Sequence, residues 1–266
     1  MHERQPSRTA FGAAGYRAAH QVLEGGRVFS DPYARRILGP DGEALIAALS
    51  VGPAHAGMRL FMAGRSRFAE DRIGAAVARG VRQAVVLGAG LDTFALRNPY
   101  ADAGLRVFEA DHPATQAWKR RRLAEAGLET PASLTFAAID FERDDLGRGL
   151  EAAGFDPDRP AVFVWLGVTP YLGRAAIAAT LRWIAGLPGS EVVFDYSEPL
   201  EAYPPETRAQ VAALEAYAAQ MGEPWLSHFD PAEIAAELRG YGFSDLEDLG
   251  VAQMAVRYLG APGDGA

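Results

Sequence analysis

A strand-like apolar run that ends in two glycines is the first candidate for chemistry in this chain. In the stretch VVLGAGLDTFALR, residues 85–97, β-branched residues lead into Gly88-Ala89-Gly90, and a helix-like segment follows. A strand, a glycine turn and a helix in this order hold nucleotide-like ligands in many proteins. The turn alone is compatible with a dinucleotide, a phosphate or S-adenosylmethionine, which imply three different reactions.

Acidic residues follow the next strand-like run at a suggestive distance. Glu109 and Asp111 lie 21 residues after Gly88 and Gly90, respectively. An acid at this position can accept hydrogen bonds from both ribose hydroxyls of a bound cofactor. This feature serves NAD and S-adenosylmethionine equally, so it narrows the ligand to a nucleoside without choosing between them.

Residues around the glycine turn argue against two of the three ligands. No G-x-x-x-x-G-K-[ST] sequence follows Gly88, which excludes a phosphate-binding P-loop. The dinucleotide pattern G-x-G-x-x-G/A requires a small residue where this chain has Thr93. The only lysine, Lys119, has Thr115 four residues before it, so the tyrosine–lysine pair of short-chain dehydrogenases is missing. Methyl transfer from a sulfonium fits what remains, because it depends mainly on alignment and exclusion of water.

The composition sets further limits on function. The 266 residues contain no cysteine, and the histidines show no metal-ligand spacing, so we expect no metal site. The net charge of −8 argues against a nucleic-acid partner. The first 20 residues lack an apolar signal core, and no run is long enough to span a membrane, so we expect a cytoplasmic protein.

The apolar pattern predicts how these residues are positioned. Continuous apolar runs predict strands at 83–88, 105–110, 133–139, 161–167 and 191–196. Helical spacing predicts helices at 59–80, 112–126, 144–153, 173–186, 205–221 and 231–240. Buried strands that alternate with helices indicate an α/β fold with a doubly wound, Rossmann-like parallel sheet.

We interpret residues 1–266 as one domain with four parts. They are a helical N-terminal cap at 1–80, a cofactor-binding core at 81–200, a helical insertion at 201–230 and a closing region at 231–266. In the closing region, GFSDLEDLG and VAQMAVRYLG are expected to form two closing strands after a helix. The cap and the insertion are expected to form a lid over the reacting groups.

Several motifs, in order along the chain, resemble one known family. They are RTAFGAAGYRAAHQ with VFSDPYARRILG, then AGRSRFAEDRI, VVLGAGLDTFALR, VFEADHPATQAWKRRRL and WLGVTPYL. From Arg8 to about Tyr196 the chain resembles the leucine carboxyl methyltransferase family, in particular its bacterial branch. The resemblance implies a class I methyltransferase fold and S-adenosyl-L-methionine as the cofactor.

The same resemblance assigns cofactor contacts to individual residues. Arg65 is expected to pair with the methionyl carboxylate, because a guanidinium binds a carboxylate through two parallel hydrogen bonds. Asp111, ahead of Glu109, is the expected ribose acid. Leu166 is also an expected cofactor residue. Many family members have an acid at this position, so Leu166 is not expected to hydrogen-bond the cofactor. The remaining expected cofactor residues are Gly88, Ala89 and Gly90 beneath the cofactor, with Asp140 and Phe141 beside its adenine.

The acceptor side is less specified by the sequence. Tyr171 and Arg17 are expected to contact the substrate, as is Tyr196 just after the fifth strand. Tyr171 and His20 are the candidate catalytic residues. An acceptor carboxylate is already ionised at neutral pH and needs no base, whereas a hydroxyl needs one. His20, His112 and His228 are candidates for that base.

These features predict an O-methyltransferase that uses S-adenosylmethionine and acts on a carboxyl or hydroxyl group of a small-molecule metabolite. Two alternatives stay open on the sequence. The first is an NAD(P)-dependent oxidoreductase with an atypical glycine pattern. The second is a non-catalytic binding protein built on a methyltransferase scaffold.

Overall fold

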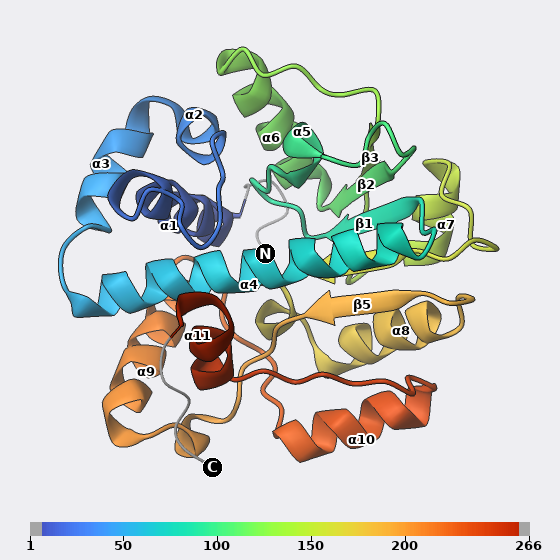
Figure 1. Cartoon of the computed structure of the whole chain (residues 1–266). Coiled ribbons are helices and arrows are strands. Elements are labelled where there is room, and N and C mark those ends of the chain that lie inside the picture. Colours follow the sequence, from blue (N-terminus) through green and yellow to red (C-terminus); the bar gives the residue numbers. More distant parts are fainter. Residues whose placement is uncertain (1–6, 261–266) are drawn as a thin grey trace.

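A five-stranded parallel sheet forms the centre of the molecule in a computed structural model, which describes residues 7–260. The strands lie in the order β3-β2-β1-β4-β5 (Figure 1). Their bounds are β1 Gln83–Leu87, β2 Arg106–Asp111, β3 Leu134–Ala138, β4 Val162–Trp165 and β5 Glu191–Phe194. The order reverses at β1, whose neighbours are β2 on one side and β4 on the other. All five predicted strands and the predicted doubly wound α/β fold are confirmed.

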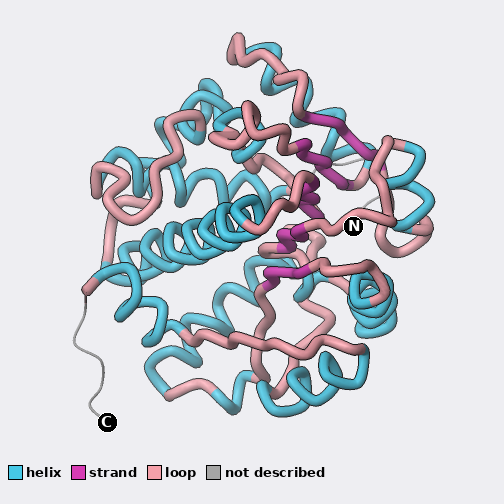
Figure 2. Tube along the Cα trace, turned by 45° about the vertical axis from the view of Figure 1, so that its right-hand side comes forward, coloured by secondary structure: helices cyan, strands magenta, loops and turns pink. Residues whose placement is uncertain are grey.

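Helices lie on both sides of the sheet, as Figure 2 shows. Their bounds are α1 Arg8–Leu23, α2 Ala34–Leu38, α3 Gly42–Ala48, α4 Pro53–Ala78, α5 Phe94–Arg97, α6 Pro113–Glu125, α7 Leu146–Ala152, α8 Arg174–Ala185, α9 Pro205–Gln220, α10 Pro231–Tyr241 and α11 Val251–Leu259. Short 3₁₀ turns occur at η1 Gly39–Asp41, η2 Thr169–Tyr171 and η3 Leu200–Ala202. The helices predicted within 59–241 are all present.

Alternate residues of the central strands point to two apolar layers. Val85 and Leu87 of β1 join a core with α7, α8 and α10. Ala84 and Val86 face the opposite side and pack with α4 and α5. Both faces of β1 are therefore buried, which explains why it reads as a continuous apolar run in the sequence.

A third apolar cluster attaches the N-terminal helices to the rest of the molecule. Residues of α1, α2 and α3 pack around Leu91 of the glycine turn and Leu123 of α6. The cap, defined here as residues 7–52, thus contacts the turn that follows β1. Residues 1–6 and 261–266, which belong to the predicted cap and closing region, lie outside the described part.

The prediction of two closing strands is wrong. Residues 243–250 form a loop, and α11 follows where the second strand was expected. Met254, Ala255 and Tyr258 are the partly buried residues of α11, and their spacing suits one helix face. Two residues of α11 contact α4. Met254 lies 3.5 Å from the position that a Cβ on Gly64 would occupy, and Tyr258 donates a hydrogen bond to Asp71. This segment forms a helix and not a strand because its partly buried residues lie on one helix face, which packs against α4.

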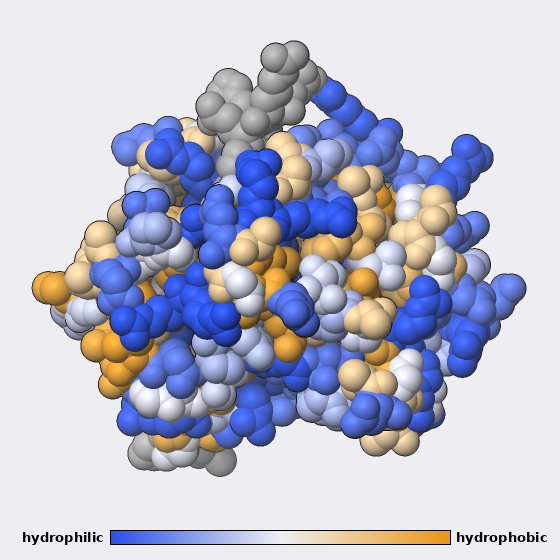
Figure 3. Space-filling view, turned by 90° about the horizontal axis from the view of Figure 1, so that it is seen from above, coloured by the Kyte–Doolittle hydropathy of each residue, from blue (hydrophilic) through white to orange (hydrophobic). Residues whose placement is uncertain are grey.

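The surface is mixed in character. Figure 3 shows hydrophilic and hydrophobic residues interspersed on the face seen from above. Among the helices of residues 7–260, none combines the length and apolar character needed to cross a membrane.

Candidate functional site

The glycine turn lies at the carboxyl end of β1 and needs glycine at two positions. Gly88 and Gly90 have φ values of +64° and +47°, in the left-handed region that favours glycine. A Cβ on Gly88 would overlap the side chain of Val168, and one on Gly90 would lie 2.9 Å from Cβ of Ala10. The turn is therefore packed between the segment after β4 and helix α1.

Asp111 fixes this turn from the neighbouring strand. Its Oδ2 accepts a hydrogen bond from the Gly90 N–H at 2.5 Å, and its Oδ1 accepts one from the His112 N–H at 2.7 Å. Burial raises the pKa of Asp111, although these two N–H groups oppose the rise. Each carboxylate oxygen has two lone pairs, so Asp111 can hold the turn and still accept a hydroxyl hydrogen bond.

Glu109 has a different partner. Its side chain is 2% exposed, and its Oε2 lies 2.5 Å from Nζ of Lys119 on α6. Burial raises the pKa of Glu109 to about 7, even though Lys119 acts to lower it. Glu109 therefore links β2 to α6, and Asp111 is the acid of this strand that contacts the turn.

Arg65 lies on α4 and reaches the carboxyl ends of β4 and β5. Its Nη1 donates a hydrogen bond to Oδ2 of Asp195, the residue directly after β5. Asp195 also accepts from the Gly167 N–H at 2.6 Å and, through its main-chain oxygen, from the Thr169 hydroxyl. Sequence reasoning missed Asp195, although its signal was an acid at the end of a predicted strand, as for Asp111.

The residues expected beside the adenine lie after β3. Oδ1 of Asp140 accepts from the Glu142 N–H at 3.1 Å, and its Oδ2 lies 3.9 Å from Nε2 of His112. Phe141 packs against the core layer of α7 and α8. Nδ1 of His112 accepts a hydrogen bond from the Ala114 N–H and so caps α6. Asp111 and Asp140 are thus brought to adjacent strand ends.

An aromatic row extends from η2 toward α9. The Tyr171 ring is 6.5 Å from the Trp225 ring, which is 6.3 Å from the His228 ring, between centroids. Nε2 of His228 lies 2.8 Å from Oε1 of Glu215 on α9. Burial raises the pKa of Tyr171. Trp225 and Glu215 were not singled out from the sequence, because nothing near them in the chain marks their role.

The loop that carries Trp225 and His228 spans two strand ends. The Leu226 N–H donates to the Pro170 carbonyl at 2.6 Å, and the Phe229 N–H donates to the Ser197 carbonyl at 2.9 Å. Pro170 follows β4 and Ser197 follows β5. This loop therefore places the aromatic row at the same edge of the sheet as the glycine turn.

Four other predicted site residues have contacts within the protein. Arg17 pairs with Asp31 and donates to the Leu91 carbonyl, and His20 is fully buried beside Glu24. Burial lowers the pKa of His20. The Tyr196 hydroxyl donates to Asp248 at 2.6 Å, and Leu166 packs against the core layer of α4. The structure does not bring Arg17 or His20 into contact with Tyr171.

The arrangement defines a candidate ligand site at the carboxyl ends of β1 and β4. In open α/β sheets, ligands bind at this edge, where the strand order reverses. An acid, Asp111, lies on the β2 side of the glycine turn, and a guanidinium, that of Arg65, lies on the β4 side. Among residues 7–260, no group of three or more acidic or histidine side chains is arranged to hold a metal ion.

Comparison with known proteins agrees with this architecture. The chain is 37% identical over 172 residues to a Bacillus subtilis protein named "Putative S-adenosyl-L-methionine-dependent methyltransferase YktD", covering 64% of this chain and 56% of that protein. A Rhodococcus jostii protein with the same descriptive name is 38% identical over 192 residues, covering 70% and 64%. The chain thus spans about six tenths of the length of these relatives.

A solved structure and a family profile complete the comparison. A DUF574 family protein from Streptomyces avermitilis shares the fold, with a TM-score of 0.51, 19% identity, and coverage of 85% of this chain and 80% of that one. The sequence profile of the leucine carboxyl methyltransferase family matches residues 10–185, which include most of α1, the glycine turn, Arg65, Asp111 and Tyr171. The chain belongs to the leucine carboxyl methyltransferase family.

Proposed function

We propose that this protein is an S-adenosylmethionine-dependent methyltransferase that methylates an oxygen atom, of a carboxyl or hydroxyl group, on a small molecule. One observation carries the proposal. A chain of this family places an acid against the glycine turn of β1 and a guanidinium across from it, at the ends of β4 and β5.

The residues present suit this cofactor. Asp111 retains lone pairs for the ribose hydroxyls, and the Arg65 guanidinium has five N–H donors, of which the bond to Asp195 uses one. Asp140 is the expected partner of the adenine amino group, with Phe141 as its apolar neighbour, and Leu166 is expected elsewhere on the cofactor side. The bound cofactor would supply a methyl group on a sulfonium, so the protein itself needs to align the acceptor and exclude water.

A dinucleotide suits the same residues less well. Thr93, at the position where the dinucleotide pattern has glycine or alanine, is fully buried and donates a hydrogen bond to Asp31 at 2.6 Å. The helix that follows, α5, has only four residues. Such a short helix offers little of the dipole that stabilises a pyrophosphate. Both features support the methyltransferase over the oxidoreductase alternative.

The acceptor side is compatible with two nucleophiles. A carboxylate would need positioning alone, for which Tyr171 and Trp225 are candidates. A hydroxyl would need a base, and the His228–Glu215 pair has the geometry of an imidazole oriented by a carboxylate. His112 already accepts a backbone N–H through Nδ1, and His20 is enclosed within the cap.

Calorimetric titration with S-adenosylmethionine tests the cofactor assignment. Arg65→Ala should weaken binding at least tenfold, because a charge-assisted contact to a carboxylate is lost. Arg67→Ala is the matched control, since Arg67 lies on the same helix, is half exposed and pairs with Asp71. Equal affinity of Arg65→Ala and wild type would refute the assigned carboxylate contact.

A mass-spectrometric screen tests the transfer itself. Purified protein and S-adenosylmethionine would be incubated with a panel of carboxylic acids and phenols, and each product would be examined for an added methyl group. We expect a methyl ester or a methyl ether. Cofactor binding without turnover on any panel member would favour the alternative of a binding protein on this scaffold.

A further inference from the structure

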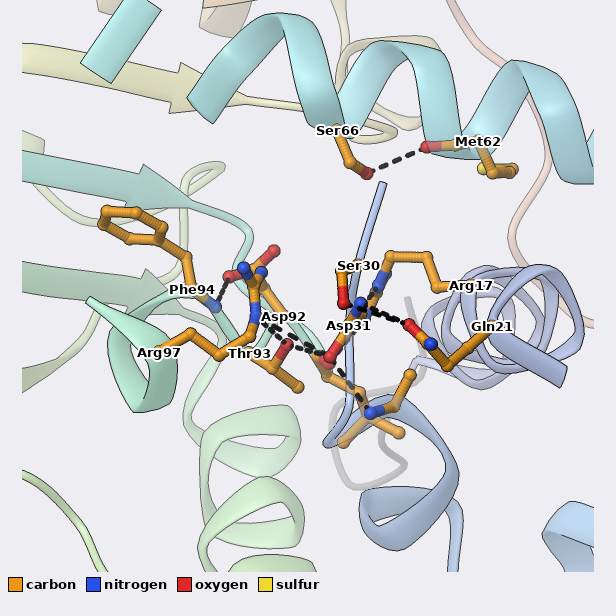
Figure 4. A network of polar contacts seen from close by, with 12 residues as sticks. Arg17, Gln21, Ser30, Asp31, Met62, Ser66, Asp92, Thr93, Phe94 and Arg97 are labelled. Carbon is orange, nitrogen blue, oxygen red and sulfur yellow. Dashed lines mark hydrogen bonds and ion pairs between the residues drawn. The ribbon is translucent and has the colours of Figure 1, made fainter. Parts of the chain in front are cut away.

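A buried ionic network joins the cap to the glycine turn (Figure 4). Asp31, 1% exposed, lies between α1 and α2 and accepts from Nε of Arg17 at 3.0 Å and from the Thr93 hydroxyl at 2.6 Å. Burial alone would raise the pKa of Asp31, but Arg17 and Arg97, with the hydroxyl of Thr93, lower it below its ordinary value. Asp31 is therefore a buried carboxylate that stays ionised.

The other contacts of the network converge on the residues that follow Gly90. Nη2 of Arg17 donates to the Leu91 carbonyl at 2.7 Å. Nε of Arg97 donates to the Thr93 hydroxyl oxygen at 3.2 Å, while its two Nη groups bond both carboxylate oxygens of Glu70 on α4. Leu91 and Thr93 are thus bonded to the cap through Arg17 and Asp31, and Thr93 is also linked to α4 through Arg97.

We propose that Arg17, Asp31 and Thr93 are positioning residues for the cofactor turn, and that they couple cofactor affinity to docking of the cap. Asp111 holds the N–H of Gly90 from the β2 side, and Arg17 holds the carbonyl of Leu91 from the cap side. Two consecutive residues of the turn are therefore fixed by two separate parts of the chain. The inference rests on the proposed cofactor and assigns these three residues a role that does not require contact with it.

The chemistry of the network favours positioning over simple stabilisation. Buried charges are expensive to desolvate, and apolar side chains of similar size often give equal or greater stability. Charged groups do, however, fix one geometry, because each donor must meet a specific acceptor. Thr93, which departs from the dinucleotide pattern, supplies the hydroxyl through which the turn joins this network.

A matched arginine on α4 that also bonds the cap offers a control. Arg59 on α4 is 6% exposed, pairs with Glu24 and donates to the Leu49 carbonyl at 2.7 Å. Arg17 and Arg59 therefore make the same kinds of bond, but only Arg17 bonds the turn. Arg17→Lys and Arg59→Lys should lower the melting temperature similarly, whereas only Arg17→Lys should change the turn.

The test combines calorimetry with amide hydrogen exchange. Thr93→Val and Arg17→Lys should each weaken S-adenosylmethionine binding about tenfold, as loss of one buried hydrogen bond implies. Thr93→Ser, which keeps the hydroxyl, and Arg59→Lys should stay within about threefold of wild type. In the ligand-free protein, amides of residues 89–93 should exchange faster in Thr93→Val and Arg17→Lys only.

The outcomes separate this inference from the proposed function. If wild type fails to bind S-adenosylmethionine, the proposed function fails, and the exchange of residues 89–93 alone decides whether the network positions the turn. If Arg17→Lys and Arg59→Lys change affinity and exchange equally, the network is merely structural and the inference is overturned. The same holds if Thr93→Val matches Thr93→Ser in both measurements.

Discussion

The buried Glu109–Lys119 pair makes the stability of this protein depend on pH in a specific direction. Burial raises the pKa of Glu109 from 4.5 in its ordinary state to about 7 in the folded protein. At pH values between 4.5 and 7, Glu109 is therefore protonated more often in the folded state than in the unfolded state. The free energy of unfolding contributed by Glu109 therefore falls as pH rises from 4.5 to 7, by about 3 kcal/mol.

A double variant isolates this contribution. Glu109→Gln with Lys119→Met removes both titrating groups while nearly keeping their shapes. Urea unfolding of wild type and double variant, followed by circular dichroism between pH 4.5 and 7.5, gives the difference in unfolding free energy. Relative to the double variant, wild type should lose about 3 kcal/mol as the pH rises to 7. Glu125→Gln, at an exposed position of α6, should track wild type at every pH.

The single variant Lys119→Met tests the pairing itself. Without the ammonium group, Glu109 would lose its buried partner and take up a proton at neutral pH, and breaking a buried pair in this way costs about 3–5 kcal/mol. The loss should continue to grow above pH 7, because the pKa of Glu109 rises further without Lys119.

The comparison of wild type with the double variant can refute this account of Glu109. The account is wrong if the difference between their unfolding free energies stays constant within about 1 kcal/mol from pH 4.5 to 7.

Three further predictions concern the site. Gly88→Ala should lower the unfolding free energy by about 1–3 kcal/mol in urea, because its φ is +64° and Val168 blocks a Cβ; adding Val168→Ala should restore part of the loss. Asp111→Asn should weaken S-adenosylmethionine binding about tenfold by calorimetry, with an unchanged circular dichroism spectrum, since one acceptor oxygen is replaced by a donor. If the acceptor screen yields a phenol, His228→Gln should slow its methylation roughly 100-fold or more and leave methylation of a carboxylic acid unchanged; equal loss on both would argue against a base.

The sheet could be predicted from the sequence because burial on both faces leaves a strong signal. Strands such as AVVL at 84–87 are apolar at every position, and β1 is buried throughout. α11 was missed because its sequence, VAQMAVRYL, fits a strand as readily as a helix. Its packing against α4 decides the conformation, and a local pattern carries no information about that partner.

The expected cofactor residues and the contacts that support them left signals of different strength in the sequence. Gly88, Gly90 and Asp111 are recognisable because glycine turns and strand-end acids keep fixed distances in the sequence. The bonds of Asp31 to Arg17 and Thr93 join residues 14 and 62 positions apart, with no motif that links them. Asp195, the partner of Arg65, lies 130 residues from it. Such pairs are visible only once the chain is folded.

The central claim is that the β1 turn, with Asp111 and Arg65 on either side, binds S-adenosylmethionine and not a nicotinamide dinucleotide. Isothermal titration of the wild-type chain with S-adenosylmethionine, NADH and NADPH under one set of conditions tests it most directly. The account predicts saturable binding of S-adenosylmethionine at one site per chain and no binding of either dinucleotide. Binding of NADH or NADPH without binding of S-adenosylmethionine would contradict it.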